Sequence, residues 1–361
     1  MGLSASLGGI FHKLARPAFV KGSTRKLLAV RDSLPYGVPY AFLKYQIRSP
    51  TPLDEEAIWR EITSQLPAVI EFVADHWPLR PLRWALLHAK MKQDHVLGIA
   101  AHYDVSNEFY ELFLDKKYMF YSCADFLRGG DETIEEAQQN KADFILRLID
   151  PQPGETILEL GCGWGAMLKR ICEQTGDSDS LHGITLSREQ VSYNQEHNGF
   201  NVEFDDFITR QYEPNAYDAI YSIGAWEHVR PHEIAPLSKK LYDAVKPGGR
   251  VVHHFFCRVP PHLFATAICS QIFFPGSIGS TYHENLDAFE GAGFRVEHRS
   301  IHDYRPTLRA WFDNLVANRE RALQLVDVQT YNRYVTFFPS SWRLFNDGKL
   351  MLVRWVLRKP A

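Results

Sequence analysis

The sequence lacks the marks of several common protein classes. It has five cysteines, an odd number, and none of them forms a CxxC pair, which argues against both a disulfide framework and a zinc site. No apolar run reaches the length of a membrane-spanning helix, and the N-terminus has neither the apolar core nor the cleavage site of a signal peptide. We therefore expect a protein of the reducing cytoplasm that binds no metal.

A large net charge is also missing. The 361 residues include 40 Lys and Arg against 43 Asp and Glu, which gives a formal charge of −3. Nothing in this balance points to a nucleic-acid partner. The chain is 45% hydrophobic and 23% charged, which is ordinary for a protein with a large core. Its length suggests one large domain with an appendage.

The first fifty residues depart from this balance. They contain a single acid, Asp32, and eight basic residues: Lys13, Arg16, Lys21, Arg25, Lys26, Arg31, Lys44 and Arg48. Apolar residues lie between them at near-helical spacing. This pattern suits an anionic bilayer surface and equally a basic face packed on the protein's own core. With helices expected over 53–77 and 82–93, residues 1–95 form a predicted helical N-terminal domain, for which membrane-surface and homodimer contacts are the candidate roles.

The stretch TILELGCGWG (156–165) is the centre of the remaining chain. Its apolar residues predict a buried strand that turns directly into a helix over 166–175. Gly161, Gly163 and Gly165 allow the backbone to turn tightly and to approach a ligand closely. Dinucleotide-binding proteins share this turn, but Glu159 would repel a pyrophosphate and suits the ammonium group of S-adenosylmethionine (SAM). The stretch therefore predicts a SAM site.

Strand and helix patterns alternate around this turn. A helix is expected over 133–149, followed after the turn by strands over 181–185, 202–205, 219–223, 250–255 and 349–358, with helices over 188–196 and 231–245. Such alternation predicts an α/β domain over 96–361, with a Rossmann-like parallel sheet, helices on both faces, and the ligand at the carboxyl edge.

One insertion interrupts the alternation. Residues 259–282 contain no Asp, Glu, Lys or Arg, and 263–274 are almost wholly apolar. Twelve residues are too few to span a bilayer. They suit a buried helix or the wall of an apolar ligand channel. Their position after a strand that should end at the active site favours the channel wall.

The motifs resemble those of one enzyme family over residues 98 to 357. The matching pieces are HYDVSNEFYELFLD (102–115), YSCADF (121–126), ETIEEAQQNK (132–141), ILELGCGWG (157–165), GITLSREQ (183–190), SIGAWEHV (222–229), the Phe274-Pro275-Gly276 turn and DYRPTLRAW (303–311). In this order they resemble the cyclopropane-fatty-acid synthases and mycolic-acid methyltransferases, which use SAM. The first hundred residues carry no such resemblance.

The resemblance implies cofactor-binding roles for the matching positions. The methionine part of SAM is expected at Tyr121, Ser122, Glu159, Gly161, Gly163 and Gly165. The ribose is expected at Thr185, Leu186 and Gln190, where Gln190 replaces the acid that many methyltransferases use. The adenine is expected beside Asp206 and Phe207.

The resemblance also implies a catalytic group. In this family a bicarbonate ion is thought to act as the base, held by a small polar cage. The matching residues are Cys123, Glu227, His254 and Tyr304. Glu227 and His228 together also suit a structural role at a helix N-terminus, so the pair by itself does not decide the function.

Two departures concern the acceptor. The family usually continues its fifth strand as His-Thr-Ile, where this chain has His254-Phe255-Phe256, and Ser341 replaces a common cysteine. The resemblance implies a C-methyltransferase that acts on the double bond of an unsaturated acyl chain carried on a phospholipid, and we expect the enzyme to be peripherally bound to a membrane. A small-molecule N-methyltransferase and a catalytically inactive lipid-binding relative are the alternatives.

Overall fold

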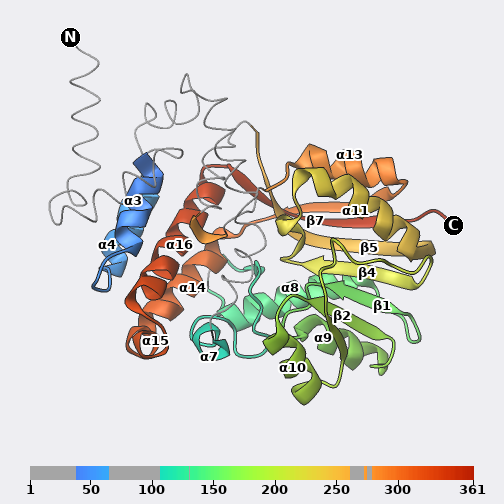
Figure 1. Cartoon of the computed structure of the whole chain (residues 1–361), viewed down its shortest axis with the longest axis horizontal. Helices are drawn as coiled ribbons and strands as arrows, with labels where there is room; N and C mark the ends of the chain where they lie inside the picture. Colours follow the sequence, from blue (N-terminus) through green and yellow to red (C-terminus); the bar gives the residue numbers. More distant parts are fainter. Residues whose placement is uncertain (1–37, 65–105, 130, 261–271, 275–278) are drawn as a thin grey trace, which may run out of the picture.

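The structure, a computed structural model, describes residues 38–64, 106–129, 131–260, 272–274 and 279–361. A seven-stranded sheet runs through it in the order β3-β2-β1-β4-β5-β7-β6 (Figure 1). The strands are β1 (Ile157–Leu160), β2 (Leu181–Thr185), β3 (Asn201–Phe204), β4 (Tyr217–Ile223), β5 (Val245–Arg258), β6 (Arg295–His302) and β7 (Leu350–Arg358). The α/β architecture expected from the sequence is confirmed.

The helices of the sheet domain are α8 (Ile134–Ile149), α9 (Ala166–Thr175), α10 (Arg188–His197), α11 (Pro231–Ala244) and α13 (Tyr282–Ala292), with a 3-10 turn, η1 (Trp226–His228). The remaining helices are α3 (Val38–Ile47), α4 (Glu55–Thr63), α7 (Asn107–Tyr110), α14 (Arg305–Ala317), α15 (Arg319–Leu325) and α16 (Val328–Asn346).

The sheet is mixed, where the sequence predicted a parallel one. Strands β1 to β5 are parallel, but β7 pairs antiparallel with both β5 and β6. The last strand therefore lies inside the sheet, and β6 forms the edge. The sequence analysis missed β6 because its residues alternate between partly buried and exposed, so no apolar run announces it.

Local sequence explains the elements next to the site. Thr133 and Glu136 form a capping box at the start of α8, each side chain accepting a hydrogen bond from the other residue's backbone N–H. Helix α9 and strand β2 have the bounds that the sequence predicted. Strand β5 begins at Val245, earlier than expected. The glycine turn lies between β1 and α9, both of which form as the sequence predicted.

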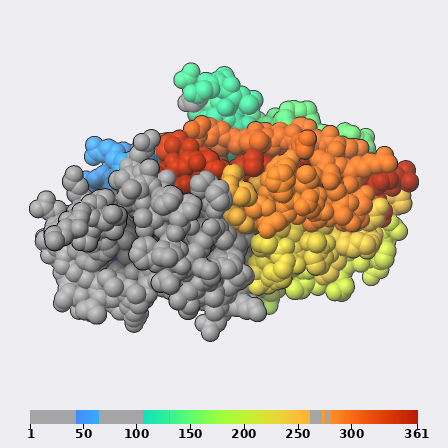
Figure 2. Space-filling model, turned by 90° about the horizontal axis from the view of Figure 1, so that it is seen from above, coloured from blue at the N-terminus to red at the C-terminus, as the bar shows by residue number. Residues whose placement is uncertain are grey.

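Helices cover both faces of the sheet. Helices α8, α9 and α10 lie on one side in Figure 1, and α11 and α13 on the other. Figure 2 shows the segments of α11 and α13, in yellow and orange, side by side on the surface. Each face buries its own apolar cluster, which includes Ile145 and Met167 on the first side and Leu237 and Phe289 on the second.

A third, largely aromatic cluster lies beyond the carboxyl ends of the parallel strands, under α14, α15 and α16. In Figure 1 these helices stand at the end of the sheet opposite the C-terminus, with α3 and α4 beside them. Trp59 of α4 packs on Phe312 of α14, with 4.6 Å between ring centroids. The backbone N–H of Leu53 donates to Asn332 Oδ1 of α16 (3.0 Å). The described part of the N-terminal region thus shares this core.

Helix α4 lies in the first part of the expected helix over 53–77, of which residues 65–77 lie outside the described residues. It starts at Glu55 and ends at Thr63, because Ser64 is extended and its hydroxyl donates to the carbonyl of Glu61. The expected helix over 82–93, and most of the basic residues of 1–50, lie outside the described residues. Membrane-surface and homodimer contacts therefore stay predictions. Within the described ranges, no helix has both the length and the apolarity needed to cross a membrane.

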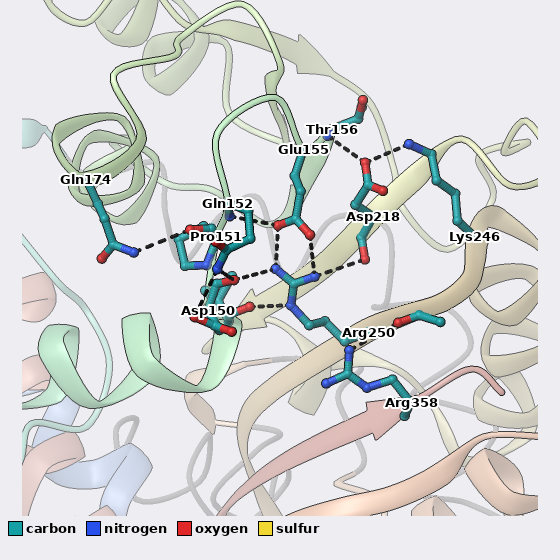
Figure 3. A network of polar contacts seen from close by, with 12 residues as sticks. Asp150, Pro151, Gln152, Glu155, Thr156, Gln174, Asp218, Lys246, Arg250 and Arg358 are labelled. Atoms are coloured by element: carbon teal, nitrogen blue, oxygen red, sulfur yellow. Dashed lines mark hydrogen bonds and ion pairs between the residues drawn. The ribbon is translucent and has the colours of Figure 1, made fainter. Parts of the chain in front are cut away.

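A polar network fixes the opposite, amino edge of the sheet (Figure 3). The guanidinium of Arg250, at this end of β5, donates to both oxygens of Glu155 (2.9 and 2.6 Å), to the carbonyl of Asp150 (2.9 Å) and to that of Ile149. It is nearly inaccessible to solvent. One arginine thus ties the end of α8 and the turn before β1 to the sheet.

Replacing Arg250 by Met should lower the free energy of unfolding by about 3 kcal/mol, because it leaves a carboxylate and two carbonyls without their donor. Urea unfolding followed by circular dichroism measures this change. Arg358→Met is the matched control, since the Arg358–Glu297 pair is half-exposed and should contribute less than about 1 kcal/mol. Equal losses in the two variants would contradict a special role for Arg250.

Candidate active site

The glycine turn places its backbone at the carboxyl end of β1. Gly161 has φ +75°, and a Cβ there would lie 2.6 Å from Cβ of Ala225, so only glycine lets β1 approach the end of β4. Gly163 has φ +55° and open space where a Cβ would point. Gly165 caps α9 and packs on Asn194. The turn is tight on its protein side and open at Gly163.

A hydrogen bond fixes the carboxyl group of Glu159. Glu159 and Tyr221 are register partners on the parallel strands β1 and β4, and the Tyr221 hydroxyl donates to Glu159 Oε2 (2.8 Å). Both side chains are buried. Burial raises the pKa of Glu159 to about 8, although the bond from Tyr221 and the charge of Lys141 oppose this. In the described structure Glu159 is thus a buried acid near its neutral state at pH 7.

A cavity of about 470 Å³ opens over this turn. Nine of the predicted cofactor residues line it: Tyr121, Ser122, Glu159, Gly161, Gly163, Thr185, Leu186, Gln190 and Phe207. Gly165 and Asp206 do not. The Asp206 carboxylate accepts from the backbone N–H of Ile208 (2.9 Å) and so shapes a turn, while its neighbour Asp205 lines the cavity. The placement of Asp206 beside the adenine therefore stays a prediction, with Asp205 as a second acid at the cavity.

The segment 185–190, which begins at the last residue of β2 and lines the cavity, is held by side-chain hydrogen bonds. Thr185 Oγ1 donates to Gln190 Oε1 (2.6 Å), and Ser187 caps α10 by accepting from the backbone N–H of Gln190 (3.3 Å). Asn194, one turn further along α10, donates to the carbonyl of Gly163 (3.0 Å). The sequence analysis missed Asn194, which joins α10 to the glycine turn.

A buried lysine contacts the cavity wall formed by Phe120 and Ser122. Lys141 of α8 is fully buried, and its Nζ donates to Ser122 Oγ (2.9 Å) and lies 3.3 Å from the centroid of the Phe120 ring. Burial lowers the pKa of Lys141 to about 7, against the opposing charge of Asp115. A lysine on the apolar face of a predicted helix was visible in the sequence, but its partner was not.

The four predicted cage residues come from four separate segments that meet beside the cavity. Gly224 connects three of them: its N–H donates to the carbonyl of His254 (2.9 Å), and a Cβ on it would lie 3.2 Å from Ser122 and 3.9 Å from Glu227. Cys123 Sγ donates to the carbonyl of Asp303 (3.5 Å), the residue before Tyr304. None of the four lines the cavity itself.

Two of these residues hold buried polar atoms that lack a partner within the described part of the chain. They are Glu227 Oε2 and His254 Nε2. Burial raises the pKa of Glu227 to about 8. The pKa of His254 lies well below its usual value because of burial first, and then the charges of Arg354 and Lys141. Both groups are set toward their neutral forms, and a buried polar atom without a partner is costly.

Aromatic rings surround the neighbouring space. Tyr121 packs on Trp311, Tyr110 and Phe113, with ring centroids 5.1, 5.4 and 5.9 Å away. Tyr110 also meets Trp164 of the glycine turn at 5.6 Å. Such rings exclude water and attract positive charge through their faces. The site can therefore hold a cationic, apolar reaction partner beside neutral hydrogen-bonding groups.

A glycine turn and a buried carboxyl after the first strand, at the carboxyl edge of a sheet in this order, are the arrangement of a SAM-dependent methyltransferase, and this chain is one. Residues 90–355 match the family model described as mycolic acid cyclopropane synthetase. The chain belongs to this family, and the resemblance seen in the sequence is confirmed.

Two similar proteins are named as methyltransferases. The S-adenosylmethionine-dependent methyltransferase UmaA of Mycobacterium tuberculosis is 31% identical over 282 residues, which cover 71% of this chain and 95% of UmaA. A probable fatty acid methyltransferase of Pseudomonas putida is 31% identical over 285 residues, covering 74% and 71% of the two chains.

Solved structures agree on the fold. Mycolic acid cyclopropane synthase CmaA1, complexed with SAH and CTAB, matches with a TM-score of 0.66 at 28% identity and covers 73% of this chain and 98% of its own. Coclaurine N-methyltransferase has a TM-score of 0.64 and covers 93% of this chain, but at 18% identity it supports the fold alone.

Cys123 should be inert toward thiol reagents in the folded protein. It is fully buried, and burial raises its pKa to about 12, so about one thiol in ten thousand is ionised at pH 8. Iodoacetamide labelling followed by peptide mass spectrometry should modify the partly exposed Cys172 well before Cys123. Labelling of Cys123 as fast as Cys172 would show that it is an accessible thiolate.

Proposed function

We propose that this methyltransferase acts on the double bond of an unsaturated fatty acyl chain carried on a phospholipid, and that the resulting cation loses a proton, either closing a cyclopropane ring or leaving a methyl-branched alkene. The observation that carries the proposal is the pair of buried, unsatisfied atoms on Glu227 and His254 beside an aromatic wall. Together they provide what methylation of an alkene requires: a dry site for a cation and a place for a base.

The described residues fit SAM in chemistry and in space. The Glu159 carboxyl suits the ammonium of the methionine part, and Gly163 leaves the backbone open to it. Gln190 and Thr185 present polar atoms for the ribose hydroxyls, and Phe207 an apolar face for the adenine. SAM supplies an electrophilic methyl group. The chain's own residues orient it and keep water away.

The aromatic site suits an alkene acceptor, because methylation of an alkene produces a carbocation that needs stabilisation. An alkene is a weak nucleophile, and its π electron pair forms the new carbon–carbon bond as the sulfonium bond to the methyl group breaks. Positive charge then remains on the acyl chain. The rings of Tyr121, Tyr110 and Trp311 would stabilise this charge without reacting with it. Ring closure needs loss of one proton from the transferred methyl group.

A bicarbonate ion fits the place for the base. His254 Nε2 and a protonated Glu227 are neutral donors that would hold a small anion without repelling it. Bicarbonate, when bound, supplies the base for the last proton. A side-chain carboxylate next to a carbocation would itself be alkylated, whereas an exchangeable ion leaves after the proton transfer. Cys123 and Tyr304 complete the proposed cage from the facing segments.

SAM affinity should rise with pH. In the free protein Glu159 has a pKa raised to about 8, and the ammonium of SAM needs the ionised form, so binding below pH 8 must release a proton. Linkage then predicts about a tenfold gain in affinity per pH unit between about pH 6 and 7.5. Calorimetry in two buffers of different ionisation heat measures both affinity and proton release. Glu159→Gln should bind weakly at every pH. A flat wild-type profile without proton release would contradict the role of Glu159.

Glu227→Leu should reduce turnover by about a hundredfold, because the anion that takes the proton loses one of its two neutral donors, with SAM affinity little changed. The assay follows labelled methyl transfer from SAM to vesicles of a monounsaturated phospholipid, and mass spectrometry should find a gain of one CH₂ group per modified chain. Glu233→Gln is the control, because Glu233 pairs with Arg230 at the start of α11 and Gln can still accept the backbone N–H of Arg230, so it should keep full activity.

Two results would overturn the proposal. One is transfer to small amines with none to unsaturated chains, which would assign the chain to the N-methyltransferases. The other is equal transfer to saturated and unsaturated phospholipids, which would show that the double bond is not the acceptor.

A further inference from the structure

A buried arginine stands behind the proposed cage. Arg354 lies on β7 directly opposite His254 on β5, as a register pair of the antiparallel strands, and none of its side chain is exposed. Its guanidinium donates to both oxygens of Asp125, at 2.6 and 2.8 Å. His302 of β6 also lies 3.3 Å from this carboxylate. The third nitrogen of the guanidinium, Nε, donates to His254.

This last hydrogen bond determines the state of the His254 ring. Arg354 Nε lies 2.8 Å from His254 Nδ1. An arginine is always protonated in proteins and only donates, so Nδ1 must accept. Nδ1 therefore carries no proton, and the neutral ring carries its proton on Nε2. That nitrogen is the buried atom for which the described residues offer no partner.

We propose that Arg354, held in place by Asp125, is a positioning residue that fixes His254 as a one-sided N–H donor toward the reacting groups. The inference rests on the proposed function for the identity of those groups, but the state of the ring does not depend on them. The arrangement reverses the serine-protease triad, where a carboxylate accepts from the histidine and leaves the other nitrogen free as a base. Here His254 donates and cannot be the base.

The electrostatics around the ring support a neutral donor. The charged and titratable groups that face it are Arg354 from β7, Lys141 from α8 and His302 from β6, and each disfavours a second proton on His254. Asp125 balances Arg354. Burial opposes ionisation of Asp125, yet the hydrogen bonds from His302 and Arg354 and the charge of Arg354 outweigh it and lower its pKa to about 2. The pair stays ionised while the ring stays neutral.

A purely structural role is the competing explanation. Asp125 also connects to α8, because its N–H donates to the carbonyl of Ala137 (3.0 Å), so the ion pair anchors the segment that carries Cys123 to the sheet. A buried ion pair is a costly anchor, however, and apolar residues of the same size often serve as well. An anchor alone would also leave the protonation of the His254 ring undetermined.

The deciding experiment needs no variant of Arg354. The full-length protein is prepared with ¹⁵N-labelled histidine rings, and the His254 signals are assigned by their loss in His254→Asn. Between about pH 6 and 8 we expect a proton on Nε2 and none on Nδ1. A protonated Nδ1, or a doubly protonated ring, would overturn the proposal. Failure of the proposed function would instead appear as absent lipid methylation with the ring still in this state.

Variants then test the positioning role. Arg354→Met should mix the two ring tautomers and reduce kcat at least about tenfold, while the dissociation constant of SAM stays within twofold. Arg354→Lys, which keeps a charged donor, should recover part of the rate. Asp125→Asn/Arg354→Met removes the charge left by the first variant and should keep the mixed tautomers. Arg358→Met is the matched control on the same strand. Unchanged kcat and a single tautomer in Arg354→Met would reduce Arg354 to an anchor.

Discussion

The burial of titratable side chains at the carboxyl edge of the sheet is the constraint on which the rest of the site depends. Glu159, Glu227, His254, Lys141 and Arg354 all lie there with almost no solvent contact. An ionised group in such a place must be paired, or it shifts toward its neutral form. Arg354 is paired with Asp125. The other four have pKa values displaced toward neutrality by burial. Before a charged ligand binds, the unpaired groups of the site are therefore displaced toward their neutral forms.

The same constraint separates the two tasks of the enzyme. Glu159 has Tyr221 as its partner on the neighbouring strand and would become ionised when an ammonium group arrives. Glu227 and His254 have no such partner among the described residues for their outward atoms. One buried carboxyl is thus prepared for a cation and the other for an anion, although both have a pKa raised to about 8. Their neighbours, and not their chemistry, distinguish them.

The pattern of neighbouring residues in the sequence predicted the features that form within one short segment of the chain. The run from β1 through the glycine turn to α9 follows from apolar residues and glycines in ten consecutive positions, and its bounds were right. Strand β6 was missed because its alternating exposed and partly buried residues give no apolar run. The Asp125–Arg354 pair joins residues 229 positions apart. The pairing of β5 with β7 sets Arg354 opposite His254, and Asp125 reaches it from the separate segment before α8. The sign in the sequence was Arg354, in the middle of an otherwise apolar run in β7.

The dependence of turnover on bicarbonate tests the central claim most directly. Wild-type protein is assayed on unsaturated phospholipid vesicles in buffer stripped of carbonate, and bicarbonate is then added in steps. If neutral donors hold an exchangeable anion that takes the proton, the rate should fall severalfold on stripping and return along a saturable curve, with SAM affinity unchanged. A rate indifferent to both removal and return would show that a side chain of this protein, and no bound anion, is the base.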